Sequence, residues 1–415
     1  MFQRIILNLP LSVRLTFSAL RYPNYRLWFY GQLVSLTGTW MQITAQGYLV
    51  FQLTHSPAFL GYVGFASGLP SWLFTLFGGV IADRMPRRTL MVITQAVMMI
   101  LAFILAGLFF LGVVQSWHII LLAFLLGVAN AFDAPARQSF VVELVDDRAD
   151  LTNAIALNGT MFNTATVVGP AVAGFAYALF GPGWCFTFNG LSFIAVIVAL
   201  LLMKLKPVEH ISRKTSALRQ IREGFEYVAN RETIRMLITN LGIVTLLGLG
   251  MVNLLPDWAV KILHGDVTTN ALLISARGAG ALMGALAVAA LGRYRIKGKL
   301  WSAGSFVLAV LMVVFAFVRW ELLSMLVLVG LGLSFMLVAN TTNALVQSEL
   351  SDDIRGRVMS IYTLIFFGAM PIGSLLTGLL ADRFGETWTV AVSGVILFGF
   401  ATLVWLRSPK LRNLD

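Results

Sequence analysis

Only a few residues of this chain could carry chemistry, and the deepest of them are ionisable side chains inside long apolar runs. Asp133 and Arg137 stand four residues apart, so on a helix they lie one turn apart and can form an ion pair. Arg277 interrupts another apolar run and has no acid close to it in the sequence. Charged side chains within a bilayer are costly and mark ion or substrate pathways. The pattern therefore predicts transport across a membrane.

Each of these charges admits two interpretations. A carboxylate in a cavity can load and release a proton as its surroundings change, which makes Asp133, with Arg137, the proton-coupling candidate. The alternative is a structural Asp133–Arg137 pair, in which the guanidinium makes the acid a poor proton carrier. Arg277 either binds an anionic group of a substrate or pairs across helices. Asp257 and Lys261 are expected near the outer surface, in contact with water.

A charged turn separates two of the apolar runs, and it must lie at the water interface. Its acid, Asp83, would face the positive N-terminal end of a later helix that begins near Ile354. Arg87 or Arg88 would then pair with Glu143. The alternative is loose surface pairing worth about 0–1 kcal/mol for each pair. The residues of this predicted conformational latch are Gly79, Asp83, Arg84, Arg87, Arg88, Glu143, Arg355 and Arg357.

Polar side chains also recur inside the apolar runs. In the first run their spacing of three and four residues places them on one helical face, which is unfavourable against lipid. They are expected to line a cavity, and the alternative is hydrogen bonding that only packs helices together. The candidate cavity residues are Gln32, Thr39, Gln42, Gln46, Asn240, Arg277, Asn340 and Asn343.

A helix kink is predicted at Gly169, Pro170 and Gly174. Proline frees a backbone carbonyl and bends a helix, whereas glycine permits close helix contact.

Composition indicates which elements must hold these residues. The 415 residues are 58% hydrophobic and only 12% charged, about half the charged share of a soluble domain. A transmembrane helix needs roughly 20 mostly apolar residues. Runs of that length predict an all-α membrane protein with twelve spans, at 27–53, 58–82, 89–113, 117–142, 151–180, 184–204, 234–262, 268–291, 299–318, 321–348, 357–381 and 386–406.

The net charge of +11 is distributed over short loops on one side of these spans. Because cytoplasmic loops are rich in Lys and Arg, both termini are expected in the cytoplasm, with the chain in a bacterial inner membrane. The basic residues form no single face, so no nucleic-acid partner is expected. Cys185 is the only cysteine, which excludes a disulfide within the chain, and no Cys/His cluster suggests a metal site.

The chain also repeats itself. Gly169, Gly174 and the Gly181-to-Trp184 turn recur in the second half as Gly373, Gly378 and the turn at 385–388, all at one constant shift. This repeat predicts two pseudo-symmetric six-helix bundles, at 1–204 and 234–415. A cytoplasmic linker at 205–233 joins them, in which apolar residues at 218, 221, 225 and 228 follow helical spacing and predict either an amphipathic surface helix or a plain linker. The same two interpretations apply to 5–20.

On these residues the chain resembles the major facilitator superfamily over essentially its whole length. The Gly79-x-x-x-Asp83-Arg84-x-x-Arg87-Arg88 turn is similar to the loop motif of that superfamily. Stretches 25–32, 131–138, 153–158, 169–174 and 355–360 resemble the exporter group that includes the enterobactin exporter and drug-efflux proteins. The resemblance implies a central cavity lined by spans one, four, seven and ten, and a latch that favours the outward-open state. It also implies a reduced antiporter motif around Gly169, with Ala173 in place of a glycine.

The predicted function is a secondary transporter, a proton-coupled exporter of small amphipathic molecules such as drugs or siderophores, working by alternating access. A lipid or lysophospholipid translocase of the same fold is the alternative, and a non-transporting membrane receptor is the alternative of another class. A lateral opening with apolar grooves would favour lipid, and an enclosed polar and aromatic cavity would favour soluble metabolites. No nucleotide-binding or metalloprotease motif occurs, so neither an enzyme nor a cofactor is expected. The expected partners are the substrate, protons and membrane lipids, and the chain is expected to be a monomer.

Overall fold

The computed structural model describes the whole chain except residues 1–16, 206–216, 292–295, 410 and 412–415. Long helices occupy all twelve predicted spans. The first six are α3 (Pro23–Thr54), α4 (Pro57–Arg84), α5 (Arg87–Phe110), α6 (Ser116–Phe140), α7 (Arg148–Phe180) and α8 (Pro182–Leu202). After the linker come α9 (Ala217–Asn230), the composite seventh span that begins with α10 (Glu232–Val244), then α12 (Val267–Leu291), α13 (Lys297–Phe317), α14 (Glu321–Ser348), α15 (Asp352–Phe384) and α16 (Glu386–Arg407).

Ten of these segments are long and apolar enough to cross a membrane, among the residues searched. The other two of the predicted twelve, α3 and α4, are 32 and 28 residues long. In α3 the stripe of Gln and Thr side chains lowers the mean hydropathy. The chain is an all-α membrane protein, as the composition predicts.

The seventh span departs from the uniform helix that its apolar run predicts. After α10 the chain passes through a π-helical segment, η3 (Thr245–Leu249), and a 3₁₀ segment, η4 (Met251–Leu254). A short α-helical turn, α11 (Leu255–Asp257), and a second π segment, η5 (Trp258–Ile262), follow. Pro256 has no backbone N–H to donate, so the regular ladder of hydrogen bonds is interrupted here. Hydropathy counts apolar residues and does not register this change of helix type.

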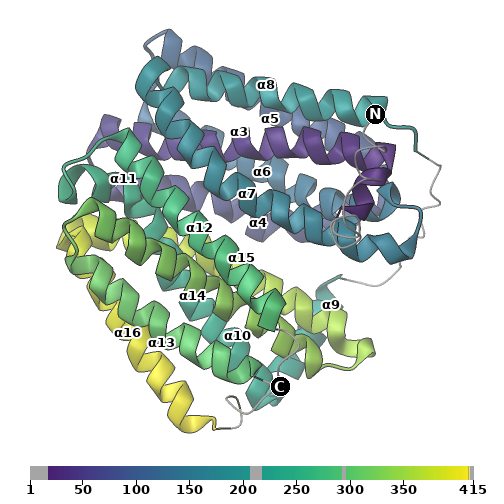
Figure 1. Ribbon diagram of the computed structural model, residues 1–415, viewed down its shortest axis with the longest axis vertical. Helices are drawn as coiled ribbons and strands as arrows, with labels where there is room; N and C mark the ends of the chain where they lie inside the picture. Colours follow the sequence, from purple (N-terminus) through teal and green to yellow (C-terminus); the bar gives the residue numbers. More distant parts are fainter. Residues whose placement is uncertain (1–16, 206–216, 292–295, 410, 412–415) are drawn as a thin grey trace.

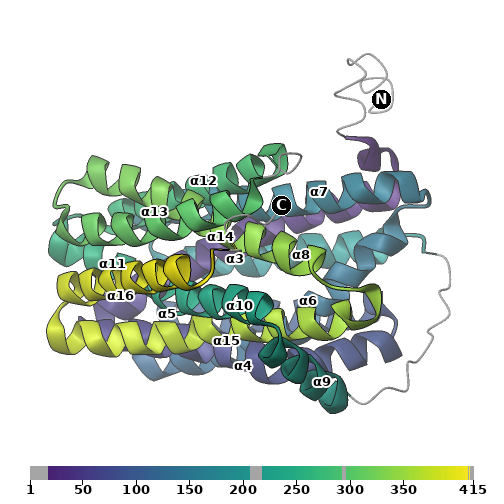
Figure 2. The ribbon, with the colours of Figure 1, turned by 90° about the horizontal axis from the view of Figure 1, so that it is seen from below.

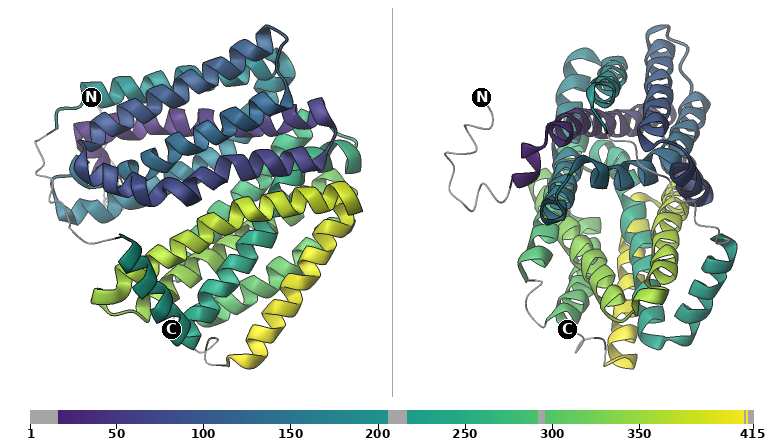
Figure 3. Two further views of the ribbon diagram at one scale, coloured as in Figure 1. Left: turned by 180° about the vertical axis from the view of Figure 1, so that it is seen from behind. Right: turned by 90° about the vertical axis from the view of Figure 1, so that its right-hand side faces the viewer.

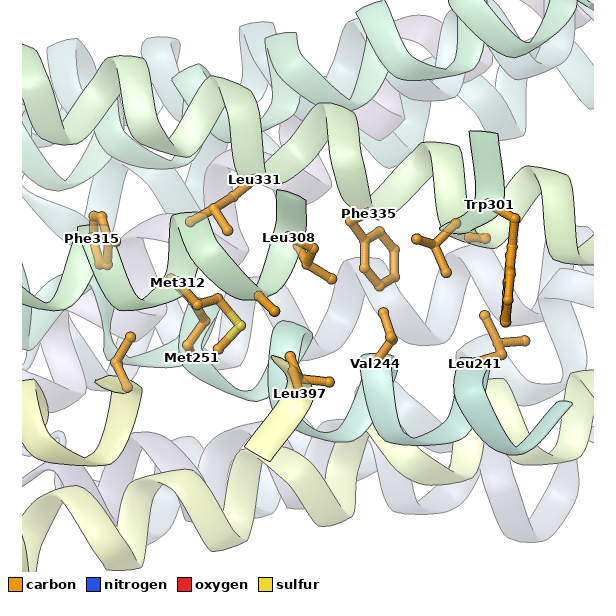
Figure 4. Packing of buried hydrophobic residues seen from close by; sticks show 14 of the residues in the cluster. Leu241, Val244, Met251, Trp301, Leu308, Met312, Phe315, Leu331, Phe335 and Leu397 are labelled. Carbon is orange, nitrogen blue, oxygen red and sulfur yellow. The ribbon is translucent and has the colours of Figure 1, made fainter. Parts of the chain in front are cut away.

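The helices form two groups. The first helix group is α3–α8 and the second is α10–α16; Figures 1 and 3 show them meeting on the side where α11 lies and spreading apart toward α9. Buried apolar side chains fill each group, and Val267 of α12 joins a cluster of the first group. Figure 4 shows the packing inside the second group, where Met251, Leu308 and Phe335 lie between the helices.

Tight turns at corresponding places join neighbouring helices in both groups. Gly181, between α7 and α8, has φ of +83°, and Gly385, between α15 and α16, has φ of +85°. Such backbone angles favour glycine, which explains why the sequence repeats a glycine at both turns. We call the end of the molecule with these two turns the glycine end, and the end with the α4–α5 turn the basic end.

The linker contains the predicted amphipathic helix, α9, which lies against the basic end of α15 (Figure 2). Gly224 packs on the backbone of Arg357, and the Glu223 carboxylate forms a 2.8 Å ion pair with the same arginine. Val228, one of the predicted apolar positions, is buried, whereas Phe225 is 44% exposed. Most of the other predicted interfacial piece, at 5–20, lies outside the described residues.

Candidate functional site

The two helix groups touch through small residues toward the glycine end. Along the α4–α15 seam, a Cβ atom placed on Gly378 would lie 2.7 Å from the Cα atom of Gly61. Further along, Gly64 faces Ser374 and Gly68 faces Pro371 in the same way. The two helices approach this closely because the glycines of α4 leave room for the opposing residues of α15. The Gly64-x-x-x-Gly68 spacing thus joins the two groups to each other.

The α7–α12 seam mirrors the first one. A Cβ atom on Gly174 would lie 2.6 Å from Cβ of Ala271, and Ser275 donates a 2.8 Å hydrogen bond to the Val167 carbonyl across the groups. Gly169 instead packs inside the first group, 2.5 Å from Cβ of Trp40 by the same measure. Pro170 lies within α7, which continues through it. The repeated glycines therefore separate into one that packs within its own group and one that crosses to the other.

Toward the basic end the α4–α15 seam opens into a cleft of about 300 Å³. Trp72, which touches Gly368, stands at its inner limit. Hydroxyl groups and large apolar side chains share the walls. The lining residues are Ser71, Trp72, Thr75, Gly356, Met359, Ser360, Thr363, Leu364 and Phe367.

The basic residues of the α4–α5 turn bind groups of the first helix group. Arg87 forms a 2.7 Å ion pair with Glu143, one of the two pairings that the sequence allowed. Arg88 donates to the carbonyl oxygens of Leu201 and Met203, at 2.7 and 3.3 Å. Arg84 is exposed, and a Cβ atom on Gly79 would meet nothing within 4 Å. The side chain of Asp83 lies outside the described residues, so the central contact of the predicted latch stays a prediction.

The arginines at the start of α15 are also engaged on their own side of the cleft. Arg357 pairs with Glu223 of α9. Arg355 donates to the Leu350 carbonyl at 3.3 Å. The contacts described at the basic end therefore lie within one helix group or join a group to α9 of the linker.

A second, polar cavity of about 160 Å³ lies within the first helix group. It brings the predicted residues Gln32 and Thr39 of α3 together with Asp133 and Arg137 of α6. The sequence did not single out Gln95 of α5 or Asn130 of α6, which also line it. Trp40 and Phe162 form an aromatic wall, with ring centroids 6.0 Å apart.

Asp133 is fully buried and well supplied with donors. Its Oδ1 atom accepts hydrogen bonds from Thr94 Oγ1 at 2.8 Å and from Gln95 Nε2 at 3.1 Å. Its Oδ2 atom lies 3.7 Å from Arg137 Nε. These contacts fix the position of the carboxylate inside the first helix group. The geometry is that of the structural pair, one of the two interpretations left open for Asp133.

The remaining predicted cavity residues are dispersed. Gln42 accepts a 2.7 Å hydrogen bond from Asn189 of α8, and Gln46 is buried nearby on α3. Asn240 faces Ser305 across 3.4 Å inside the second group. Asn343 accepts a hydrogen bond from Gln347, its neighbour on α14, at 2.6 Å, and Asn340 on the same helix is half-buried. The hydrogen bonds of Gln42 and Asn240 join neighbouring helices, which is the alternative interpretation of these polar residues.

Arg277 lies in apolar surroundings inside the second group. The space around it, about 10 Å³, is walled by Met251, Leu308 and Phe335, which Figure 4 shows side by side. Its Nε atom is buried without a hydrogen-bond partner among the described residues. A space of this size holds at most one water molecule, so it is too small for an anionic substrate group in this conformation.

The expectation that Asp257 is in contact with water is wrong. Its side chain has no exposed surface. Lys261, 41% exposed, bridges Asp257 at 2.8 Å and Glu386 of α16 at 2.9 Å, and its ammonium lies 5.6 Å from the Phe51 ring of α3. Asp257 lies on α11, which packs against α3 and α12, and Lys261 joins it to Glu386 at the start of α16. The position of Asp257 near the end of an apolar run does not reveal that its side chain is buried.

Membrane transporters are among the known sequences that resemble this chain. Residues 14–415 match the family model described as "Transmembrane secretion effector". A staphyloferrin A transporter of Staphylococcus aureus is 25% identical and aligns over 93% of this chain and 97% of its own. The multidrug efflux pump Tap of Mycobacterium tuberculosis is 28% identical over 93% of each chain. Macrolide efflux protein A of Streptococcus pyogenes is 23% identical over 95% of this chain and 99% of its own.

Solved structures show the same fold. The nucleoside transporter NupG superposes with a TM-score of 0.74 at 14% identity, covering 94% of this chain and 98% of its own. A bacterial homologue of the lysosomal transporter Spinster, in an inward-facing and unoccupied conformation, gives a TM-score of 0.73 at 13% identity with the same coverage. The relatives are transporters, not enzymes. The chain therefore belongs to the transmembrane secretion effector family and is a multi-pass membrane transporter of the major facilitator kind.

Proposed function

We propose that this protein is a secondary active exporter of small amphipathic molecules that works by alternating access and is driven by protons. One observation carries the proposal: the two helix groups are joined by close glycine contacts toward the glycine end, while a cleft separates α4 from α15 toward the basic end. A transporter that alternates between two openings needs two rigid groups that part at one end at a time. The groups correspond to the units 1–204 and 234–415, joined by the linker 205–233.

The proposed orientation follows from charge. The basic end would face the cytoplasm, together with both termini, because Lys and Arg are retained on that side. The conformation described here would then be open to the cytoplasm, which is the state in which an exporter takes up its cargo. The latch at Asp83 would close this end in the other state, with Arg355 or Arg357 near the start of α15.

The walls of the cleft fit an amphipathic cargo. Trp72, Met359 and Phe367 provide apolar contact area, and Ser360 and Thr363 provide hydroxyl groups. Ligand sites typically combine apolar walls with a few polar groups that fix orientation. Relatives named for staphyloferrin A, for macrolides and for multiple drugs support siderophore-like molecules and drugs as candidate cargoes.

Protons are the proposed energy source, and two carboxylates are candidates for carrying them. The sequence favours Asp133, with Arg137. The contacts favour Asp257 instead, because it is fully buried and pairs with Lys261, which it shares with Glu386. Two acids around one ammonium leave an excess negative charge, which a proton would relieve.

The lipid alternative has a specific observation in its favour. In Figure 2, α4 and α15 lie on one outer face of the molecule, so their cleft is near lipid. Large apolar side chains beside it are exposed, among them Leu73 at 45%, Phe77 at 61% and Phe367 at 45%. A single-chain lipid would therefore find an apolar entrance at this seam.

Transport by reconstituted protein distinguishes these candidates. The full chain is placed in liposomes with an imposed pH gradient, and a macrolide, a ferric siderophore and a lysophospholipid are offered in separate assays. The proposal expects gradient-dependent movement of the macrolide or the siderophore together with protons. Lysophospholipid movement without the other two would replace the function with the lipid one. Cargo movement with no accompanying proton movement would contradict proton coupling.

A further inference from the structure

We propose that the polar cavity of the first helix group binds a neutral, hydroxylated, six-membered ring, such as the sugar part of an amphipathic cargo. The inference rests on the proposed function and names the part of the cargo that this cavity recognises. The cavity lies among α3, α5, α6, α7 and α8 and is separate from the α4–α15 cleft.

Size sets the first limit. The cavity volume is about 160 Å³. An engineered protein cavity of about 150 Å³ accommodates benzene, so a single six-membered ring fills this space. A whole macrocycle or an acyl chain of usual length exceeds it. The cavity therefore fits one ring of a larger molecule, with the rest of that molecule remaining outside.

Charge sets the second limit. Asp133 and Arg137 offset each other, and Asp133 already accepts hydrogen bonds from Thr94 and Gln95. A second ion placed here would disturb a balanced pair whose carboxylate is buried, which is costly. The cavity thus favours a neutral group over a cation or an anion.

The unpartnered polar atoms specify the chemistry of that group. Gln32 is 1% exposed, and its Nε2 donor has no hydrogen-bond partner. Gln95 is 2% exposed, and its Oε1 acceptor also has none. Both residues line the cavity. A hydroxyl group donates and accepts, so a polyhydroxylated ring can satisfy both amides, whereas an ether or an amine salt satisfies only one kind.

The aromatic wall suits the faces of such a ring. Trp40 and Phe162 lie edge to face, with an interplanar angle of 76°. The C–H groups on the faces of a sugar ring are apolar and pack against aromatic side chains, while its hydroxyl groups point outward around the ring edge toward the amides. The rim is open, since Ile43 and Phe162 are 47% and 42% exposed. Phe162 lies one helical turn from Thr166, which contacts α12, so the mouth is next to the space between the helix groups.

Equilibrium binding tests the inference directly. The full chain is placed in lipid nanodiscs, and radiolabelled octyl glucoside is added below its micellar concentration. Octyl trimethylammonium, with the same chain and a charged head in place of the ring, is the matched probe. We expect the glucoside to bind, and Gln32→Leu and Gln95→Leu each to weaken its binding about tenfold. Gln347→Leu, an exposed amide on α14, should leave it unchanged.

A second variant keeps the test decisive if a buried substitution prevents folding. Ile43→Trp enlarges a residue at the exposed rim without removing a buried partner, and it should block glucoside binding while the protein still elutes as a single species. Binding that is equal in wild type, Gln32→Leu and Ile43→Trp would overturn the inference. Tighter binding of octyl trimethylammonium would show a cation site instead. If wild type binds no glucoside, the cavity holds water only and the inference is wrong. The proposed function is tested separately, and it fails only if the liposome assay shows no gradient-driven movement of cargo.

Discussion

The two ends of the seam between the helix groups differ in the contacts that they make. At the glycine end, backbone meets backbone at Gly61 and Gly378, and the charged groups there cross between helices, as Lys261 does toward Phe51. At the basic end, charged residues are abundant, yet Arg87 and Arg357 bind partners of their own helix group or of α9. Close contact without side chains holds one end closed, and charges that can change partners occupy the other.

This difference indicates how such a molecule would move. Glycine contacts are short-range, because a gap of about 0.5–1 Å between the backbones already forfeits a quarter to a half of their dispersion energy. Charged pairs act over a longer range and can exchange one partner for another at similar free energy. We infer that the glycine end sets the geometry of the closed state and that the basic end sets the balance between states. The following four predictions each separate these roles.

The largest effect is expected for Lys261→Met. The substitution leaves the Asp257 carboxylate buried without its partner, which should lower the free energy of unfolding by about 3 kcal/mol, the lower value for a broken buried pair because Lys261 is partly exposed. Thermal unfolding of the purified protein measures it. The double variant Lys261→Met with Asp257→Asn should recover most of the loss. An unchanged unfolding temperature in the single variant would show that the buried pair does not contribute to stability.

A smaller effect is expected for Gly378→Leu, which inserts a side chain where a Cβ atom alone would already lie 2.7 Å from Gly61. Overpacking of this kind costs about 1–3 kcal/mol, so the closed glycine end should become roughly 5- to 150-fold less populated. Transport should fall while membrane insertion is retained. Gly399→Leu on α16 is the control, because nothing lies within 4 Å of a Cβ atom there. Equal transport by the two variants would argue against the glycine contact.

Asp83→Asn should act on the other end. Removing the charge weakens an attraction to a helix N-terminus worth up to about 2 kcal/mol, so the population of the state closed at the basic end should fall by up to about 30-fold. Folding and insertion should be intact and transport strongly reduced, as measured by gradient-driven uptake in liposomes. Transport at the wild-type rate would refute the latch.

The smallest effect is expected for Arg222→Ala on α9. Its pair with Glu226 is exposed on both sides, at 83% and 59%, and such pairs contribute less than about 0.5 kcal/mol. Transport and stability should match wild type. Glu223→Gln, one residue along the helix, removes the partner of Arg357 and should shift the balance between states. If the two variants behave alike, α9 acts only as a connection.

The sequence predicts the helices well because hydrophobicity and length are properties of each run by itself. It also predicts the glycine repeat, whose residues occupy matching places at Gly174 and Gly378. Contacts that depend on tertiary packing could not be predicted from the sequence. Thr94 and Gln95 bind Asp133 from another helix, and nothing in their own run distinguishes them from ordinary polar residues. The burial of Asp257 depends on α3 and α12 packing against α11 and on its pair with Lys261. Which end is open depends on small free-energy differences that no local pattern expresses.

The central claim is that the two ends open in alternation, and pulsed electron spin resonance tests it most directly. Spin labels are attached in a Cys185→Ala background at exposed sites, with one pair at Thr89 and Ser348 for the basic end and another at Leu111 and Phe384 for the glycine end. Distance distributions are recorded in nanodiscs at high and low pH, with and without a macrolide. The account predicts that the basic-end distance shortens in the conditions where the glycine-end distance lengthens. Distances that stay fixed, or that lengthen together at both ends, would contradict it.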